Sequence, residues 1–197
     1  MRNFTTNKEK SSRLIFSDIQ KRKVHHLFNV LDIDRNGKLQ PDDFLNVGKK
    51  IIHKLELSPS SRGARVILLK AHRLFVQLLA ELENPEMELT LWDWVEFFRN
   101  QIESADPRIL DHYIHHTSRY IFDLFDVNKD RLISRDEYAA MLTVYNIPQN
   151  NTEKGFMELD TNNDNYISSE EMINGLSNFF KSDDANASGN MIFGEWR

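Results

Sequence analysis

The stretch DIDRNGKLQPDD, residues 32–43, places four aspartates and one glycine between two segments with a helical pattern. So many carboxylates in a short loop repel one another, and a cation bound among them would relieve that repulsion. A hard cation such as Ca²⁺ takes about six to eight oxygen ligands, which alternate positions of a 12-residue loop can supply. The stretch therefore predicts a metal-binding loop, here called loop 1.

The same arrangement recurs as DVNKDRLISRDE at 126–137 (loop 3) and DTNNDNYISSEE at 160–171 (loop 4). All three loops carry oxygen-bearing side chains at positions 1, 3, 5, 9 and 12, and position 7 offers a backbone carbonyl. Position 9 is Gln40, Ser134 or Ser168. The other expected ligands are Asp32, Asp34, Asn36, the carbonyl of Lys38 and Asp43 in loop 1; Asp126, Asn128, Asp130, the carbonyl of Leu132 and Glu137 in loop 3; and Asp160, Asn162, Asp164, the carbonyl of Tyr166 and Glu171 in loop 4.

Helices are expected on both sides of each loop. Apolar residues before loop 1 (24, 27, 28 and 31) and after it (44, 47 and 51) follow the i, i+3, i+4, i+7 spacing of an amphipathic helix. Capping signals agree with these boundaries. They are Ser17 with Gln20, Asp106 before Pro107, Ser134 with Glu137, and Ser168 with Glu171.

A further helix–loop–helix unit is expected between residues 58 and 105, because such units normally occur in pairs. Its loop is LENPEMELTLWD, 82–93, here called loop 2. Leu82 at position 1 cannot bind a cation, so we expect loop 2 to be structural and metal-free. Leu89 at position 8 would then pair with Leu39 of loop 1, and Glu83, Glu86 and Glu88 would form a solvated acidic turn.

These loops with their flanking helices resemble EF-hands, and four hands with a degenerate second one resemble the sarcoplasmic calcium-binding protein group. The segments YNIPQN (145–150) and FFKSDDANASGNMIFGEWR (179–197) are similar to the calexcitins of that group. The resemblance implies an all-α fold of four EF-hands in two packed pairs, with short β contacts between paired loops. It also implies calcium binding and a signalling or buffering role.

Four segments are expected: an N-terminal extension (1–16), an N-terminal EF-hand pair (17–104), a C-terminal pair (105–181) and a tail (182–197) that packs on the hands.

Two residues depart from the usual loop pattern. Asp43 at position 12 is one methylene shorter than glutamate, which favours Mg²⁺ as an alternative in loop 1. Arg131 at position 6 of loop 3 stands where a sharp turn favours glycine.

Composition limits the classes of partner. The chain has 197 residues, a formal net charge of -5 and no cysteine, so it offers neither thiolate ligands nor a broad basic field for nucleic acid. No apolar run has the length of a signal peptide or a membrane span. We expect a cytoplasmic monomer without stable membrane insertion or enzymatic activity, which binds up to three Ca²⁺ ions and has a protein target if it is a sensor.

Two alternatives to a calcium sensor stay open, and one further group of residues has the pattern of a metal site. A Ca²⁺/Mg²⁺ buffer would have the same sequence pattern. The apolar residues that line the open groove of a sensor are the same ones that fill the closed core of a buffer. A calcium-triggered photoprotein is less favoured. The resemblance implies that such a protein holds its luciferin with His, Trp and Tyr around the last helix and the tail, and residues 172–190 contain none of these. The cluster of His112, His115 and His116 with Asp111 has the spacing of a transition-metal site on one helix face, although a solvated helix surface explains it better.

Overall fold

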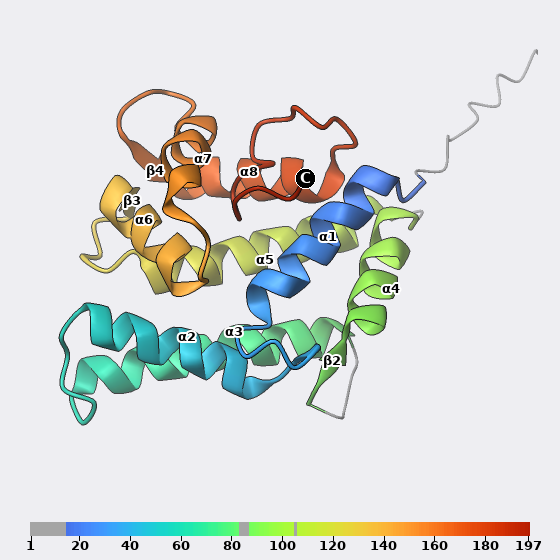
Figure 1. Cartoon of the computed structure of the whole chain (residues 1–197). Helices are drawn as coiled ribbons and strands as arrows, with labels where there is room; N and C mark the ends of the chain where they lie inside the picture. The colour runs from blue at the N-terminus through green and yellow to red at the C-terminus, as the bar shows by residue number, and fades with distance from the viewer. Residues whose placement is uncertain (1–14, 83–86, 105) are drawn as a thin grey trace, which may run out of the picture.

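The computed structural model describes residues 15–82, 87–104 and 106–197, and folds them into helices joined by short loops (Figure 1). The expected extension 1–16 lies outside the described residues except for Ile15 and Phe16. The described chain contains α1 (Asp18–Leu31), α2 (Pro41–Lys54), α3 (Arg62–Leu82), α4 (Leu91–Ile102), α5 (Pro107–Phe125), α6 (Arg135–Val144), the short 3-10 helix η1 (Gln149–Asn151), α7 (Thr152–Leu159) and α8 (Ser169–Lys181).

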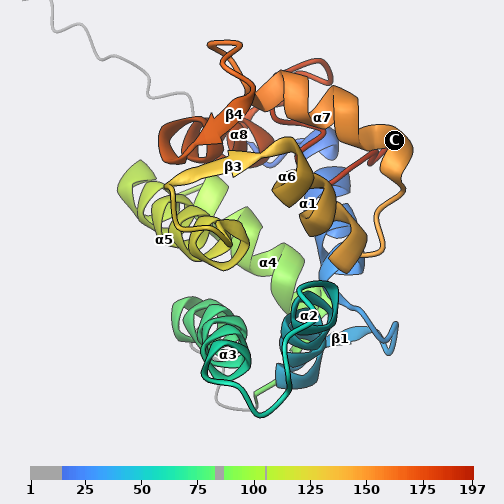
Figure 2. The same cartoon turned by 90° about the vertical axis from the view of Figure 1, so that its left-hand side faces the viewer.

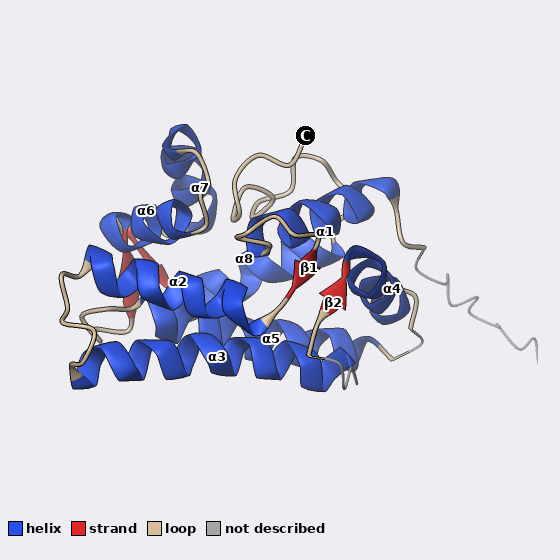
Figure 3. Cartoon of the chain, turned by 60° about the horizontal axis from the view of Figure 1, so that its bottom comes forward, coloured by secondary structure: helices blue, strands red, loops and turns tan. Residues whose placement is uncertain are grey.

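Two pairs of short antiparallel strands join the loops (Figure 3). Leu39 lies opposite Leu89 and Ile133 opposite Ile167, and all four side chains are fully buried. The predicted all-α fold with short β contacts between paired loops is thereby confirmed. The strands are β1 (Lys38–Leu39) with β2 (Leu89–Thr90), and β3 (Leu132–Ser134) with β4 (Tyr166–Ser168).

Helix starts coincide with the capping residues in the sequence, because a side-chain oxygen there accepts a bond from an otherwise unpaired backbone N–H. The three predicted capping boxes are present, and Asp106 accepts from the Arg108 N–H as an N-cap. Two further boxes, Gln40 with Asp43 and Thr90 with Asp93, start α2 and α4. In each of the four loops, position 12 therefore also belongs to the first turn of the exiting helix.

One hydrophobic core runs through both pairs of hands. Phe98 of α4 stacks on Phe180 of α8 with ring centroids 4.7 Å apart, and Tyr113 of α5 packs edge-on against Phe98 at 5.4 Å. The buried indole of Trp94 donates to the Val24 carbonyl of α1 at 2.9 Å. Each aromatic pair contributes about 0.5–1.5 kcal/mol beyond its burial. The two pairs of hands consequently share their packing and are not separate globules.

The C-terminal segment, residues 182–197, lies beside α1 and α8 (Figures 1 and 2). Polar side chains of α1 fasten it: Lys23 Nζ donates to the Ser182 carbonyl at 2.7 Å, and His26 Nε2 to the Phe193 carbonyl at 2.8 Å. Gln20 of the same helix donates to the Lys181 carbonyl at 2.9 Å. The apolar side chains of the segment are buried, namely Met191, Ile192, Phe193 and Trp196.

Candidate calcium sites

Loops 1, 3 and 4 share one backbone conformation. Their first residues end a helix with nearly identical angles: φ −73° and ψ 79° at Asp32, −69° and 84° at Asp126, and −72° and 80° at Asp160. Position 6 is left-handed in each loop, as the turn requires. Its φ is +80° at Gly37, +70° at Arg131 and +67° at Asn165.

Position 4 is left-handed as well, which the sequence does not reveal. Arg35, Lys129 and Asn163 have φ values of +60°, +64° and +59°. Asparagine is common in this conformation, whereas an arginine or a lysine in a sequence gives no indication of it. The loop geometry therefore imposes two unfavourable backbone positions in each loop, and only Gly37 avoids the cost of a side chain.

Loop 1 gathers its acids most closely. One ligand oxygen from each of Asp32, Asp34 and Asp43 lies within 4.8 Å of the other two, and in the described part of the chain no other His, Asp or Glu side chains form such a trio. Asp32 and Asp34 both accept from the Asn36 N–H, at 3.1 and 3.0 Å. The Lys38 amine turns away to Glu88 at 2.7 Å, while its carbonyl stays at position 7. This arrangement fits a small hard cation.

The position 12 residue of loop 1 is almost completely buried, with 1% of Asp43 exposed. Burial raises its pKa above the usual aspartate value, and the charge of Asp34 adds to this. Hydrogen bonds from the backbone N–H groups of Gln40, Asp34 and Ile33 offset part of the effect. A carboxylate held in this way is costly to leave charged without a cation, which agrees with a role as ligand.

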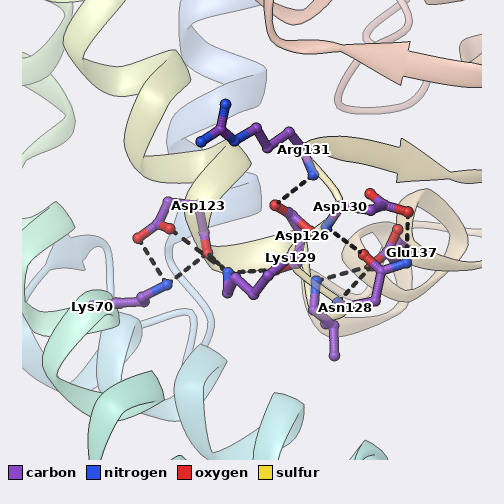
Figure 4. A network of polar contacts seen from close by, with 9 residues as sticks. Lys70, Asp123, Asp126, Asn128, Lys129, Asp130, Arg131 and Glu137 are labelled. Atoms are coloured by element: carbon purple, nitrogen blue, oxygen red, sulfur yellow. Dashed lines mark hydrogen bonds and ion pairs between the residues drawn. The ribbon is translucent and has the colours of Figure 1, made fainter.

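Loop 3 contains a carboxylate oxygen without a partner. Asp126 Oδ1 is buried and accepts no hydrogen bond, although Oδ2 accepts from the Arg131 N–H at 3.3 Å. Glu137 accepts from Val127 N–H at 2.9 Å and from Ser134 N–H at 2.9 Å (Figure 4). Buried polar atoms are rarely left unsatisfied, so the free Asp126 oxygen is the feature of this loop that best fits a metal ion.

A chain of charges connects loop 3 to the N-terminal pair of hands (Figure 4). Lys70 of α3 forms an ion pair with Asp123 of α5 at 2.8 Å, and Lys129 of loop 3 approaches the same carboxylate at 3.6 Å. Lys129 also donates to the carbonyls of Asp123 and Asp126. The contact between Lys70 and Asp123 was not predicted, because it joins residues 53 positions apart.

Loop 4 has the most complete set of hydrogen bonds. Asp160 accepts from the Asp164 N–H at 3.1 Å and the Asn165 N–H at 3.0 Å. Burial raises the pKa of Glu171, but hydrogen bonds from Ser168 and Thr161 outweigh it and hold that pKa below the usual glutamate value. Thr161, which the sequence analysis missed, donates its hydroxyl to Glu171 at 2.9 Å.

Loop 2 is described only in part. The side chain of Leu82 and residues Glu83 and Glu86 lie outside the described residues, so a metal-free loop 2 stays a prediction. Met87 is left-handed at φ +57°, which agrees with position 6. Glu88 differs from the expected solvated turn, because it pairs with Lys38 at 2.7 Å and accepts from Gln40 at 3.1 Å. Loop 2 thereby braces two residues of loop 1.

The histidine cluster on α5 does not assemble with its acid. The His112 and His116 rings lie 4.1 Å apart, both exposed, and His115 is exposed too. Asp111 instead forms an ion pair with Lys181 of α8. This favours the reading of the cluster as a solvated helix face.

Comparison with known families agrees with the loop geometry. Residues 10–50 match the model of an EF-hand domain pair and residues 153–177 match that of an EF hand. No curated protein sequence matches the chain. These two segments are EF-hand modules, in which a helix–loop–helix unit carries a loop suited to Ca²⁺.

Several solved structures share the fold of this chain. The sarcoplasmic calcium-binding protein of amphioxus is 16% identical over 91% of this chain and 98% of its own, with a TM-score of 0.67. The coelenterazine-binding protein of Renilla muelleri, in a Ca-loaded apo form, is 18% identical over 91% and 99%, with a TM-score of 0.76. Magnesium-loaded berovin, a ctenophore photoprotein, is 20% identical over 80% and 86%, with a TM-score of 0.57.

Among the described residues, no helix combines the length and the apolar character needed to span a membrane.

Proposed function

We propose that this protein is a Ca²⁺-dependent signal modulator that binds one ion in each of loops 1, 3 and 4. Bound Ca²⁺ supplies the positive charge that cancels the repulsion among the carboxylates of each loop. The proposal is supported by the carboxylate trio of loop 1, the unsatisfied oxygen of Asp126 and the matching backbone of loop 4. We further propose that it acts in the cytoplasm as a monomer on a protein target.

The observation that carries a sensor role is the double attachment of α8. At its N-terminus, Glu171 belongs both to loop 4 and to the capping box of the helix. At its C-terminus, the carbonyls of Phe180 and Lys181 accept from Gln20 of α1, and Phe179 packs edge-on against Phe193 of the C-terminal segment at 5.3 Å. If Glu171 exchanges its hydrogen bonds for a metal ion, the start of α8 is affected. The other end of the same helix contacts the C-terminal segment, whose apolar side chains are buried in the core.

A Ca²⁺/Mg²⁺ buffer is the second candidate, and a different observation favours it. The stacked Phe98 and Phe180 belong to opposite pairs of hands, so opening one pair breaks contacts of the other. The short side chain of Asp43 suits the tighter six-ligand geometry of Mg²⁺. The three loops of berovin, which shares this fold, bind magnesium ions.

A photoprotein role has less support. The cavity at the centre of the four hands, lined by Trp94, Tyr113 and Phe180 among others, measures about 20 Å³. A space of that size holds about one water molecule. A luciferin would have to displace several core side chains, so mixing with coelenterazine and adding Ca²⁺ is expected to give no light.

Calorimetric titration of the metal-stripped chain with Ca²⁺, in the presence and absence of Mg²⁺, tests the proposal. A sensor is expected to bind three Ca²⁺ ions with dissociation constants of roughly 10⁻⁷ to 10⁻⁵ M that Mg²⁺ barely changes. Hydrogen exchange of the C-terminal segment should then increase when Ca²⁺ is added. Strong competition by Mg²⁺ together with unchanged exchange would establish the buffer instead.

A further inference from the structure

A depression of about 560 Å³ lies between α3, α5, loop 3 and the start of α8. Four basic side chains line it: Arg73 from α3, His116 and Arg119 from α5, and Arg131 from loop 3. Its volume falls in the range of small-molecule sites, about 300–1,000 Å³. Cations from three separate elements therefore converge on one cavity of a protein that is acidic overall.

The guanidinium groups in this depression have no partners of their own. In the described part of the chain, Arg73, Arg119 and Arg131 make no side-chain hydrogen bond or ion pair, and Figure 4 shows the Arg131 side chain pointing away from the acids of loop 3. Elsewhere Arg108 pairs with an acid at 2.7 Å and Arg135 at 2.5 Å. Other arginines of the described chain, such as Arg22 and Arg65, are also unpaired, but these three line one cavity of a chain that has 30 acids and 25 bases.

Arg131 adds a second observation, because its backbone is strained. It has φ +70° at a position where glycine or asparagine would be less costly. Loops 1 and 4 use those two residues there, Gly37 and Asn165. Arg131 therefore lines the cavity although its backbone conformation is unfavourable. Its role in the turn does not explain why an arginine is there.

Two carboxylates share the depression and limit when an anion can enter. Asp123 is neutralised by Lys70 at 2.8 Å and Lys129 at 3.6 Å. Asp126 is the position 1 ligand expected in loop 3, so its charge opposes an anion until a cation is bound there. Ser169, the first residue of α8, adds a hydroxyl donor near the positive end of a 13-residue helix.

We propose that this cluster binds a phosphate monoester, either on a small soluble molecule or on a lipid headgroup. A tetrahedral dianion can accept from several planar guanidinium groups at once, and the three arginines of this cavity come from three different elements. A single carboxylate would satisfy fewer of the donors. Tyr120 and Phe122 supply ring surface in the same cavity for the part of the ligand that bears the phosphate.

The phosphate site and loop 3 are coupled through Asp126, a consequence that rests on the proposed function. Calcium in loop 3 removes the carboxylate charge that faces the cavity, so the phosphate is expected to bind more tightly when Ca²⁺ is present. Because such coupling is reciprocal, the phosphate must raise the calcium affinity of loop 3 by the same factor.

The test uses the full chain and glycerol 3-phosphate as the soluble probe, titrated calorimetrically with and without Ca²⁺ at micromolar free concentration. A parallel arm measures sedimentation with phosphatidylcholine vesicles, with or without phosphatidate. Binding in the soluble arm alone identifies a free phosphate ester, binding in the vesicle arm alone identifies a headgroup, and binding in both supports the shared chemistry. No binding in either arm overturns the proposal.

The variant Arg73→Gln with Arg119→Gln is expected to weaken phosphate binding roughly tenfold for each arginine removed. Its calcium titration should match that of the unaltered chain, because neither residue belongs to a loop. Arg65→Gln removes an exposed cation from α3 outside the cavity and should change nothing. Equal losses in the double variant and this control would mean that general charge binds the probe, which overturns the site. Phosphate binding without dependence on Ca²⁺ would overturn the coupling alone.

Discussion

The buried amine of Lys23 should make the stability of this protein depend on alkaline pH. Its side chain is fully buried on α1, and Nζ donates to the Ser182 carbonyl at 2.7 Å, to Asn190 Oδ1 at 3.0 Å and to the Asn178 carbonyl at 3.4 Å. Burial lowers the pKa of Lys23 from 10.5 to about 8, although the charges of Asp183 and Asp184 oppose that change.

The sign follows from proton binding. Between pH 8 and 10.5 the unfolded chain keeps its proton on Lys23 while the folded chain releases it, so the free energy of unfolding rises with pH. Below about pH 8 both states are protonated and the cost of burying the charge is constant. At about 1.4 kcal/mol for each pH unit between the two pKa values, the rise amounts to roughly 3 kcal/mol.

Urea unfolding of the metal-stripped chain across this window measures the effect, and Lys23→Met isolates it. Tyr138 and Tyr145, whose pKa values burial raises, oppose the trend near its upper end, but they are common to both proteins. The free energy of unfolding of the unaltered chain minus that of the Lys23→Met variant should therefore increase with pH. Lys21→Met, at a half-exposed site on the same helix, is the control. A difference that stays constant from pH 8 to 10.5 would refute the reasoning.

Three further predictions concern the loops and the C-terminal segment. Asp43→Glu should raise the calcium affinity of loop 1 about tenfold in calorimetry, because the longer side chain can offer both oxygens; unchanged affinity would contradict this. Arg131→Gly should raise the free energy of unfolding by about 1 kcal/mol in urea, with little change in calcium affinity, because φ +70° is part of the folded loop. A loss of stability would show that the arginine is not strained. Gly189→Ala places a Cβ 2.4 Å from the Gly175 carbonyl oxygen and should expose the core to an apolar dye, and unaltered dye binding would count against a tightly packed segment.

Most of the helical fold was predictable because its signals are local. A capping box needs only residues three positions apart, so Ser168 with Glu171 fixes the start of α8 without knowledge of the rest. The pairing of Leu39 with Leu89 could be predicted because position 8 is apolar in every loop. Both signals depend on spacing within a loop, and spacing can be read from a sequence.

Polar side-chain contacts between distant segments could not be predicted, because no spacing rule links their residues. Lys23 stands in the run DIQKRKVHH and looks like a surface residue, yet its acceptors are more than 150 positions away. The bridge from Lys70 through Asp123 to Lys129 likewise depends on how α3 crosses α5. The close approach of three loop 1 carboxylates, in contrast to the other loops, also depends on side-chain orientation and not on ligand spacing.

The strand contact between loops 3 and 4 has a consequence for the shape of the binding curve. Ile133 and Ile167 join two loops that both carry the ligand pattern of an ion site, so an ion in one loop is expected to stabilise the backbone of the other before its own ion binds. Leu39, by contrast, is joined through Leu89 to a loop that lacks a ligand at its first position. The isotherm should therefore be the sum of a cooperative two-ion step and an independent one-ion step, with a Hill coefficient above one only for the C-terminal pair.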